Sequence, residues 1–242
     1  MRTIFVAGAS GAIGRRLLPM LVAEGWRVVG MTRSPAKAAL VSALGATPVV
    51  VDVFDGPGLQ RAIAGARPEI VVDQLTDLPP GLDASRMEEA IPRNARILDE
   101  GTRNLCAAAA AVGVRRMVAQ SGAFAYADGQ RPHAETAPLA TSAEGGQGIS
   151  ARGLASLERR ILEAPLEGLV LRYGRLYGPG TGFDAPFGPA PLHVDAAARA
   201  AALAVTRGEP GVYNVAEDDG EVSSEKARRH LGWSAEWRWK GR

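Results

Sequence analysis

The stretch that decides the fold is AGASGAIGRRL, residues 7–17, which follows the apolar run Ile4–Ala7. Its glycines Gly8, Gly11 and Gly14 recur every three residues, where a predicted strand gives way to an amphipathic helix. Glycines in such a turn allow a tight bend and let backbone N–H groups approach an anion, toward which the helix points its positive N-terminus. The stretch therefore predicts a Rossmann-type strand–loop–helix unit whose loop can hold a dinucleotide.

Strand-like and helical segments alternate along most of the chain. The strands are nearly continuous apolar runs, as expected where helices cover both faces of a parallel sheet. They span residues 3–7, 27–31, 47–51, 69–73, 115–120, 168–173 and 211–215. The helices span residues 12–24, 35–44, 57–64, 84–112, 149–163, 194–206 and 223–231. The alternation predicts an α/β fold with a doubly wound parallel sheet, interrupted by long loops at 127–148 and 178–192.

Composition places the chain among ordinary globular proteins. Its 242 residues are 46% hydrophobic and carry a net charge of +2, and its arginine pairs are scattered, so nothing indicates nucleic-acid binding. No signal peptide or membrane-spanning apolar run is visible, and the single cysteine, Cys106, suits a reducing compartment. We therefore expect a cytoplasmic protein in which Cys106 is a buried filler of an alanine-rich helix rather than a nucleophile.

The end of the second strand indicates which dinucleotide is bound. An NAD site usually carries an acidic residue about 20 positions beyond the glycines, where it binds the ribose 2′-OH. This chain instead reads GMTRSPAKA at 30–38, with Arg33, Ser34 and Lys37 and no acid. A guanidinium there pairs with a 2′-phosphate, so the sequence favours NADP(H) over NAD(H); the alternative is a solvated arginine at a helix start.

Further cofactor contacts are expected at the ends of the third and fourth strands. Asp52 is placed to meet the adenine, or alternatively caps the turn FDGP. Gln74 and Thr76 should border the nicotinamide ribose, unless they are ordinary hydrogen-bonded loop residues. The full predicted cofactor-binding set is Gly8, Ala9, Ser10, Gly11, Ala12, Ile13, Gly14, Arg33, Ser34, Lys37, Asp52, Val53, Gln74, Leu75 and Thr76.

The order of several motifs resembles that of the extended short-chain dehydrogenase/reductase superfamily, and more narrowly its atypical members grouped with NAD-dependent epimerase/dehydratases. The motifs are GASGAIG, VDVFD, GTRNL at 101–105, VRRMVAQSGAFAY at 114–126, LRYGRLYGPGT at 171–181, HVDAAARA at 193–200 and the closing RRHLGW. The resemblance implies an NAD(P)-binding Rossmann core at 1–173. It also implies a reduced C-terminal substrate lobe at 174–242, which includes later core elements and is compatible with one structural domain.

Members of this superfamily commonly use a Ser–Tyr–Lys set, and the resemblance assigns the serine to Ser121. None of the three lysines lies four residues after a tyrosine, so the usual Tyr-x-x-x-Lys dyad is absent. Aligning the helix ISARGLASLERRIL on Glu158 places Ser150 at the tyrosine position and Leu154 at the lysine position. Without an adjacent cation a tyrosine keeps a pKa of about 10 and is a poor base, whereas hydride transfer to an activated acceptor stays feasible.

Tyr126 is the nearest phenol after Ser121, so we assign these two residues as catalytic, with packing as the alternative for Tyr126. Tyr177 in RLYGPG should line the substrate pocket, His193 could assist there, and Asp195 is expected to be a helix N-cap. No group of histidines, cysteines and carboxylates has metal-ligand spacing, so no metal is expected.

These features predict an NADP(H)-binding atypical short-chain dehydrogenase/reductase, an oxidoreductase that acts on a small, fairly apolar metabolite. Two rivals are a redox-inert NADP-sensing or scaffold protein, and an epimerase, dehydratase or cyclase that retains its cofactor. Tight NADPH binding without turnover would favour the sensor. We expect a small-molecule substrate and no nucleic-acid or membrane partner, and the resemblance is compatible with a homodimer.

Overall fold

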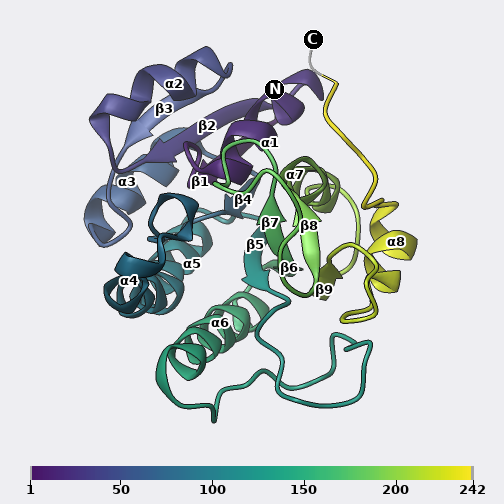
Figure 1. The fold of residues 1–242 in the computed structure, drawn as a ribbon. Coiled ribbons are helices and arrows are strands. Elements are labelled where there is room, and N and C mark those ends of the chain that lie inside the picture. The colour runs from purple at the N-terminus through teal and green to yellow at the C-terminus, as the bar shows by residue number, and fades with distance from the viewer. Residues whose placement is uncertain (1, 241–242) are drawn as a thin grey trace.

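The computed structural model describes residues 2–240, built around a seven-stranded sheet (Figure 1). The strands lie in the order β3-β2-β1-β4-β5-β6-β9, and every neighbouring pair is parallel. They are β1 (Thr3–Ala7), β2 (Arg27–Thr32), β3 (Thr47–Val50), β4 (Ile70–Asp73), β5 (Arg116–Gly122), β6 (Glu167–Tyr173) and β9 (Gly211–Val215). The predicted doubly wound, Rossmann-type parallel sheet is confirmed.

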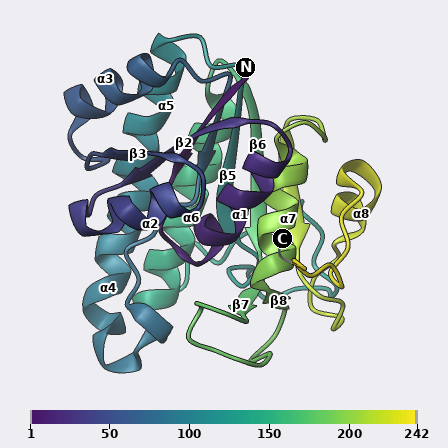
Figure 2. The same ribbon diagram turned by 90° about the horizontal axis from the view of Figure 1, so that it is seen from above.

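Helices cover both faces of the sheet, and each layer packs on its own apolar core. One layer consists of α1 (Ala12–Ala23), α2 (Ala38–Ala43), α7 (Val194–Ala204) and α8 (Glu225–Leu231). The other consists of α3 (Gly56–Ala66), α5 (Thr102–Ala111) and α6 (Gly145–Glu163), with α4 (Ala84–Arg96) against α6. In Figure 2 the sheet separates α1 and α7 from α5 and α6. Both sheet faces are therefore dry, which explains the continuous apolar strands.

Some helix boundaries differ from those predicted. The helix expected at 84–112 is α4, a π-helical turn η3 (Ile97–Gly101) and α5 in succession. The helix expected from 149 begins at Gly145, because the polar, glycine-rich first turn of α6 hides the helical periodicity. Short 3₁₀ turns precede α2 and α4, namely η1 (Pro35–Lys37) and η2 (Pro80–Leu82).

Two strands of three residues each were not predicted, because so short a run shows no periodicity. They are β7 (Arg175–Tyr177) and β8 (Pro191–His193), which pair with each other beside the main sheet and bracket the 178–190 loop. The same C-terminal segment supplies β9, which completes the main sheet next to β6. Within residues 2–240 no helix is both long and apolar enough to span a membrane.

Candidate functional site

The glycine loop between β1 and α1 is as tight as its sequence predicts. Gly8 has a φ of 81°, and a Cβ there would collide with the backbone carbonyl of Gln74 at the end of β4. A Cβ on Gly14 would lie 2.6 Å from the carbonyl oxygen of Ala9 and closer still to that of Gly8. Side chains at these two positions are therefore incompatible with the loop as it stands.

The N-terminus of α1 opens onto this loop. Gly11 is the N-cap residue, so no side chain accepts a hydrogen bond from the first turn, and that turn contains no acidic residue. The Ser10 hydroxyl lies 3.4 Å from the Thr32 hydroxyl, and Ala9 and Ile13 are buried beneath. Unpaired N–H groups and the positive end of the helix dipole suit a phosphate at this turn.

The other predicted cofactor residues follow the neighbouring strands β2, β3 and β4, so all of them lie along one carboxyl edge of the sheet. After β2, Arg33 and Lys37 are exposed and Ser34 is half-buried. After β3, Val53 is buried, whereas Asp52 is exposed and accepts a hydrogen bond from Phe54 N–H at 2.9 Å. The contact of Asp52 is that of the turn cap, and its role toward adenine stays a prediction.

Arg33 reaches from the segment after β2 to the segment after β4. Its Nη2 lies 2.6 Å from Asp77 Oδ1, and Arg93 of α4 lies 3.3 Å from the other oxygen of the same carboxylate. Although burial opposes the effect, Arg33 and then Arg93 hold the pKa of Asp77 below its ordinary value. The acid that the sequence lacks after β2 is therefore supplied in space by the loop after β4.

Gln74 is a buried amide at the end of β4, between the glycine loop and β6. Its Nε2 lies 3.5 Å from the Tyr173 hydroxyl, while its Oε1 is buried without a hydrogen-bond partner among the described residues. Leu75 accepts a hydrogen bond from Gln120, and Thr76 is exposed. A buried acceptor costs free energy unless a ligand or water pairs with it, so this amide suits a polar ligand group. The bare glycine loop and this orphaned oxygen together fit a dinucleotide.

Asp73, which points away from that groove beneath α5, is fully buried. Burial raises its pKa to about 6, although the Leu75 N–H and the Thr102 hydroxyl act in the opposite direction. The same apolar surroundings raise the pKa of the Cys106 thiol to about 12. Cys106 is therefore an unreactive filler, as its alanine-rich helix predicted.

Asp73→Asn should make the protein more stable at neutral pH. Because the folded-state pKa lies above the unfolded value of 3.8, the folded state binds the extra proton, and the wild type loses stability as pH rises from about 4 to 6. The loss is about 3 kcal/mol in total. We expect denaturant unfolding to show this gain for the variant at pH 7 and none at pH 4. Equal stability of the two proteins at pH 7 would contradict it.

Ser121 and Tyr126 meet at one buried ion pair. The Glu158 carboxylate of α6 forms a two-pronged contact with Arg172 of β6, at 2.7 and 2.8 Å. Ser121 Oγ donates to Glu158 at 2.6 Å. The Tyr126 hydroxyl accepts a hydrogen bond from Arg172 at 2.8 Å and donates one to Asn214 at 2.7 Å. Burial raises the pKa of Tyr126 against the pull of Arg172. Both candidate hydroxyls are thus engaged within the protein.

The face of α6 that packs against β5 carries both polar and apolar residues. Ser150, Leu154 and Glu158 recur at intervals of four, so they lie along one stripe. Leu154 is 6% exposed, and a Cβ on Gly122 would lie 3.2 Å from it and 2.7 Å from the ring of Phe124. Gly122, rather than Ser121, faces the leucine that stands at the lysine position.

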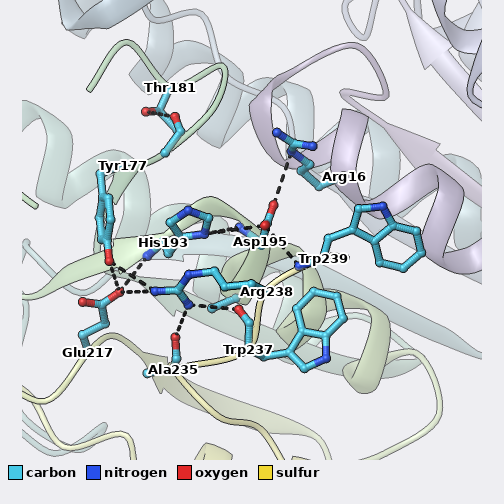
Figure 3. A network of polar contacts seen from close by, with 12 residues as sticks. Arg16, Tyr177, Thr181, His193, Asp195, Glu217, Ala235, Trp237, Arg238 and Trp239 are labelled. Carbon is cyan, nitrogen blue, oxygen red and sulfur yellow. Dashed lines mark hydrogen bonds and ion pairs between the residues drawn. The ribbon is translucent and has the colours of Figure 1, made fainter. Parts of the chain in front are cut away.

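Tyr177 and His193 lie together in the polar network drawn in Figure 3, and their role toward a substrate stays a prediction. The Tyr177 hydroxyl donates to Glu217 at 2.7 Å, and the same carboxylate oxygen accepts the His193 N–H at 3.1 Å. Arg238, from the segment after α8, approaches the Tyr177 hydroxyl at 3.4 Å. Burial lowers the pKa of His193. The Tyr177 hydroxyl is therefore already paired within the protein.

The prediction that Asp195 caps its helix is wrong. His193 is the N-cap of α7, and its Nδ1 accepts the Asp195 N–H at 3.2 Å. The Asp195 carboxylate instead lies 3.3 Å from Arg16 of α1 and accepts the N–H of Trp239 at 3.1 Å. It ties two helix N-termini to the C-terminal segment, a role that a local sequence pattern cannot reveal.

Comparison with known proteins bears directly on this edge of the sheet. A protein family characterised as NAD(P)H-binding matches residues 8–176, from the first loop glycine to β7. The chain belongs to this family. A reductase of a Streptomyces species, 3-diazoavenalumate denitrifying reductase, is 40% identical over 237 residues, which cover 89% of this chain and 76% of that protein. The dTDP-4-dehydrorhamnose reductase of Streptomyces griseus is 31% identical over 72% of this chain and 50% of its own length.

Solved structures place the family's fold among the epimerases of the superfamily that the sequence resembles. UDP-glucose 4-epimerase of Thermotoga maritima, solved with UDP-glucose, has a TM-score of 0.77 at 20% identity, covering 97% of this chain and 94% of that one. The Bordetella bronchiseptica enzyme WbmH, solved with NAD+, has a TM-score of 0.73 at 20% identity, and the match covers 92% of this chain and 78% of that one. At such identities the likeness concerns the fold alone, and it agrees with the predicted Rossmann-type sheet.

Sequence reasoning missed several residues of this site. Asp77, Arg172 and Arg175 stand directly after strand ends or within them, in QLTDLP and LRYGRLYG. A charged residue at the carboxyl end of a parallel strand is a signal that could have drawn attention to Asp77 and Arg175. Glu217 has no such signal, because its side-chain partners lie 21 or more residues away in the chain.

Proposed function

We propose that the protein is an NAD(P)H-dependent reductase of a small aromatic electrophile that needs no proton from the enzyme. Two residues of α6 carry this proposal, because Ser150 and Leu154 stand where a proton-donating pair is expected. A carbonyl acceptor must be protonated as its alkoxide forms, whereas a diazonium group already carries positive charge. The relative at 40% identity is named for the reductive removal of nitrogen from a diazo compound, which is the substrate class we propose.

The chemistry balances without an enzymatic acid. An arenediazonium ion that gains one hydride becomes an aryldiazene, which loses N₂ and leaves an arene C–H bond. Bound NAD(P)H supplies that hydride. Gly8 and Gly14 let the backbone approach the cofactor, and the buried amide of Gln74 orients a polar group beside it. Leu154 keeps water from the carboxyl end of β5, so that a reactive electrophile is protected from hydrolysis.

We also propose NADP(H) as the preferred cofactor, and Arg33→Ala tests it. The Arg33 side chain is 57% exposed and can reach a ligand. Charge-assisted hydrogen bonds of about 1.5–3 kcal/mol from Arg33 to a 2′-phosphate predict that NADPH binds about 10- to 100-fold more tightly than NADH. The variant should lose most of that difference in a calorimetric titration at low salt. Equal affinities in the wild type would contradict the preference.

Asp77→Asn is a second test of the preference for NADPH, because it removes the partner of Arg33 rather than Arg33 itself. Asp77 competes for Arg33, and an exposed ion pair contributes about 0.2–1 kcal/mol. Removing the competing charge should therefore tighten NADPH binding by about 1.5- to 5-fold and leave NADH binding nearly unchanged.

The experiment that tests the reaction follows NADPH and N₂ together. Purified protein is supplied with NADPH and an arenediazonium salt that carries a carboxylate and no hydroxyl, with enzyme-free and heat-inactivated samples as controls. We expect one N₂ released and one NADPH consumed per arene formed. Tight NADPH binding without N₂ release would favour the redox-inert sensor. A rearranged product without net NADPH consumption would favour an epimerase or dehydratase.

Tyr126→Phe separates catalysis from packing in that assay. The catalytic roles of Ser121 and Tyr126 stay predictions, and general acid catalysis by Tyr126 would cost about 10²- to 10⁴-fold in turnover on removal. Its hydroxyl is held by Arg172 and Asn214. We therefore expect a lowered melting temperature with turnover changed less than about tenfold. A fall in turnover of about 10²- to 10⁴-fold, at an unchanged melting temperature, would show instead that Tyr126 is the general acid.

A further inference from the structure

Arg175 is a guanidinium without a protein partner at the carboxyl edge of the sheet. It lies on β7, two residues beyond Tyr173, whose hydroxyl reaches the Gln74 amide. Its Nε is buried and makes no hydrogen bond, and no carboxylate in the described part of the chain forms an ion pair with it. A buried N–H group of an ion without an acceptor is costly, so the position is built for a ligand that brings one.

The surroundings of Arg175 make a partly enclosed, aromatic setting. Phe124 lies against it, with its ring centroid 5.4 Å from the guanidinium carbon, and is 46% exposed although large and apolar. Gly188, at a φ of 61°, lies close to the same side chain, so that a Cβ there would lie 3.1 Å from Arg175 Nε. The same loop carries the stacked rings of Phe183 and Phe187, with centroids 3.9 Å apart.

Phe124 and Arg175 also hold matching places in the fold. Gly122 of β5 and Tyr173 of β6 are paired residues, and each of the two side chains lies two residues beyond that pair. The Phe124 ring occupies the space above Gly122, next to Leu154. One cation and one exposed ring therefore stand side by side, with the ring next to Leu154 of α6.

We infer that Arg175 and Phe124 form a subsite for an aromatic carboxylate, the acid paired with Arg175 and the ring packed on Phe124. This rests on the proposed reductase function and names its substrate class. The Nε and Nη edge of a guanidinium matches the two oxygens of a carboxylate, and an offset ring contact is favourable on an exposed phenylalanine. One unpaired cation suits a singly charged acid, since the nearby Arg131 is already paired with Glu221 at 3.0 Å.

Cinnamate and its neutral isostere cinnamamide test the subsite by binding alone. Calorimetry on NADP+-loaded wild-type protein should show cinnamate binding about 10- to 100-fold tighter than cinnamamide. Arg175→Met should erase that difference, and Arg175→Lys should keep part of it. Arg229→Met on α8, which removes an exposed arginine far along the chain, is the matched control and should leave it intact. Phe124→Leu should weaken both ligands by a similar factor.

The outcome is independent of the diazonium assay. Equal affinity for acid and amide in the wild type, or no binding of either, would overturn the subsite even if N₂ release is observed. A preference for cinnamate over cinnamamide that persists in Arg175→Met would also overturn the subsite. If Arg175→Met does not fold, the wild-type comparison and Arg175→Lys still decide. Conversely, acid-selective binding without N₂ release would leave the subsite standing and remove the proposed reaction.

Discussion

Gly14→Val is expected to abolish NADPH binding, with a loss of more than about 100-fold in affinity, while the chain stays folded. The added side chain would be driven into the Ala9 and Gly8 carbonyls, 2.6 Å or less from its Cβ, so the loop backbone must move. The loop can move toward the groove, because the strands beneath it are fixed by the sheet. Overpacking of this kind costs about 1–3 kcal/mol, which a domain of this size survives.

Gly65→Val is the control for that experiment. Gly65 is also a helical glycine, in α3, but a Cβ there meets nothing within 4 Å. Gly65→Val makes the same change in helix propensity without a clash, and it should bind NADPH normally in a calorimetric titration. Normal binding by Gly14→Val would show that the glycines serve the fold only, and the inference drawn from the opening loop would fail.

Glu158→Gln should cause the largest loss of stability of any single change considered. It removes one charge of an ion pair whose side chains are 6% and 8% exposed, and leaves Arg172 buried and uncompensated. Breaking such a pair costs about 3–5 kcal/mol, or roughly 6–20 °C in melting temperature for a chain of this length. Thermal unfolding followed by circular dichroism measures the shift.

Glu163→Gln, one turn further along α6, provides the comparison. Glu163 forms a 3.2 Å contact with Arg159 on the exposed face, with 66% of its side chain accessible. A surface pair contributes about 0–1 kcal/mol, so this variant should melt within a few degrees of the wild type. Equal shifts for the two variants would mean that burial of the Glu158 pair is not what stabilises the fold.

The sheet and the glycine loop could be read from sequence because their causes are local. Each strand is an apolar run, and the loop glycines follow the first of them within a few residues. Strand order then follows from short right-handed connections. The same reasoning placed every predicted cofactor residue along one edge, since parallel strands share their carboxyl ends.

The polar partners could not be predicted, because they join residues that the fold alone brings together. Arg33 and Asp77 are 44 residues apart, and Ser121 and Glu158 are 37 apart. The sequence also does not show which way each side chain faces. The sequence identified Ser121 at a strand end, but only the structure shows that it faces Glu158 and that Gly122 faces Leu154. Capping of α7 by His193 likewise depends on a ring nitrogen that replaced the expected aspartate.

The segment after α8 gives the protein an optical reporter of its own. Trp233 donates its indole N–H to Ala196 of α7, Trp239 is tied to Asp195, and Trp237 lies between Arg199 and Trp239. Two of these indoles, Trp237 and Trp239, lie near Asp195 of α7, which contacts Arg16 of α1, and α1 begins at the glycine loop (Figure 3). Reduced nicotinamide absorbs where indole emits, so cofactor binding should quench their fluorescence by energy transfer. Release of the segment after α8 would instead expose the indoles to water and shift their emission to longer wavelength. One unlabelled sample can therefore distinguish cofactor binding from release of this segment.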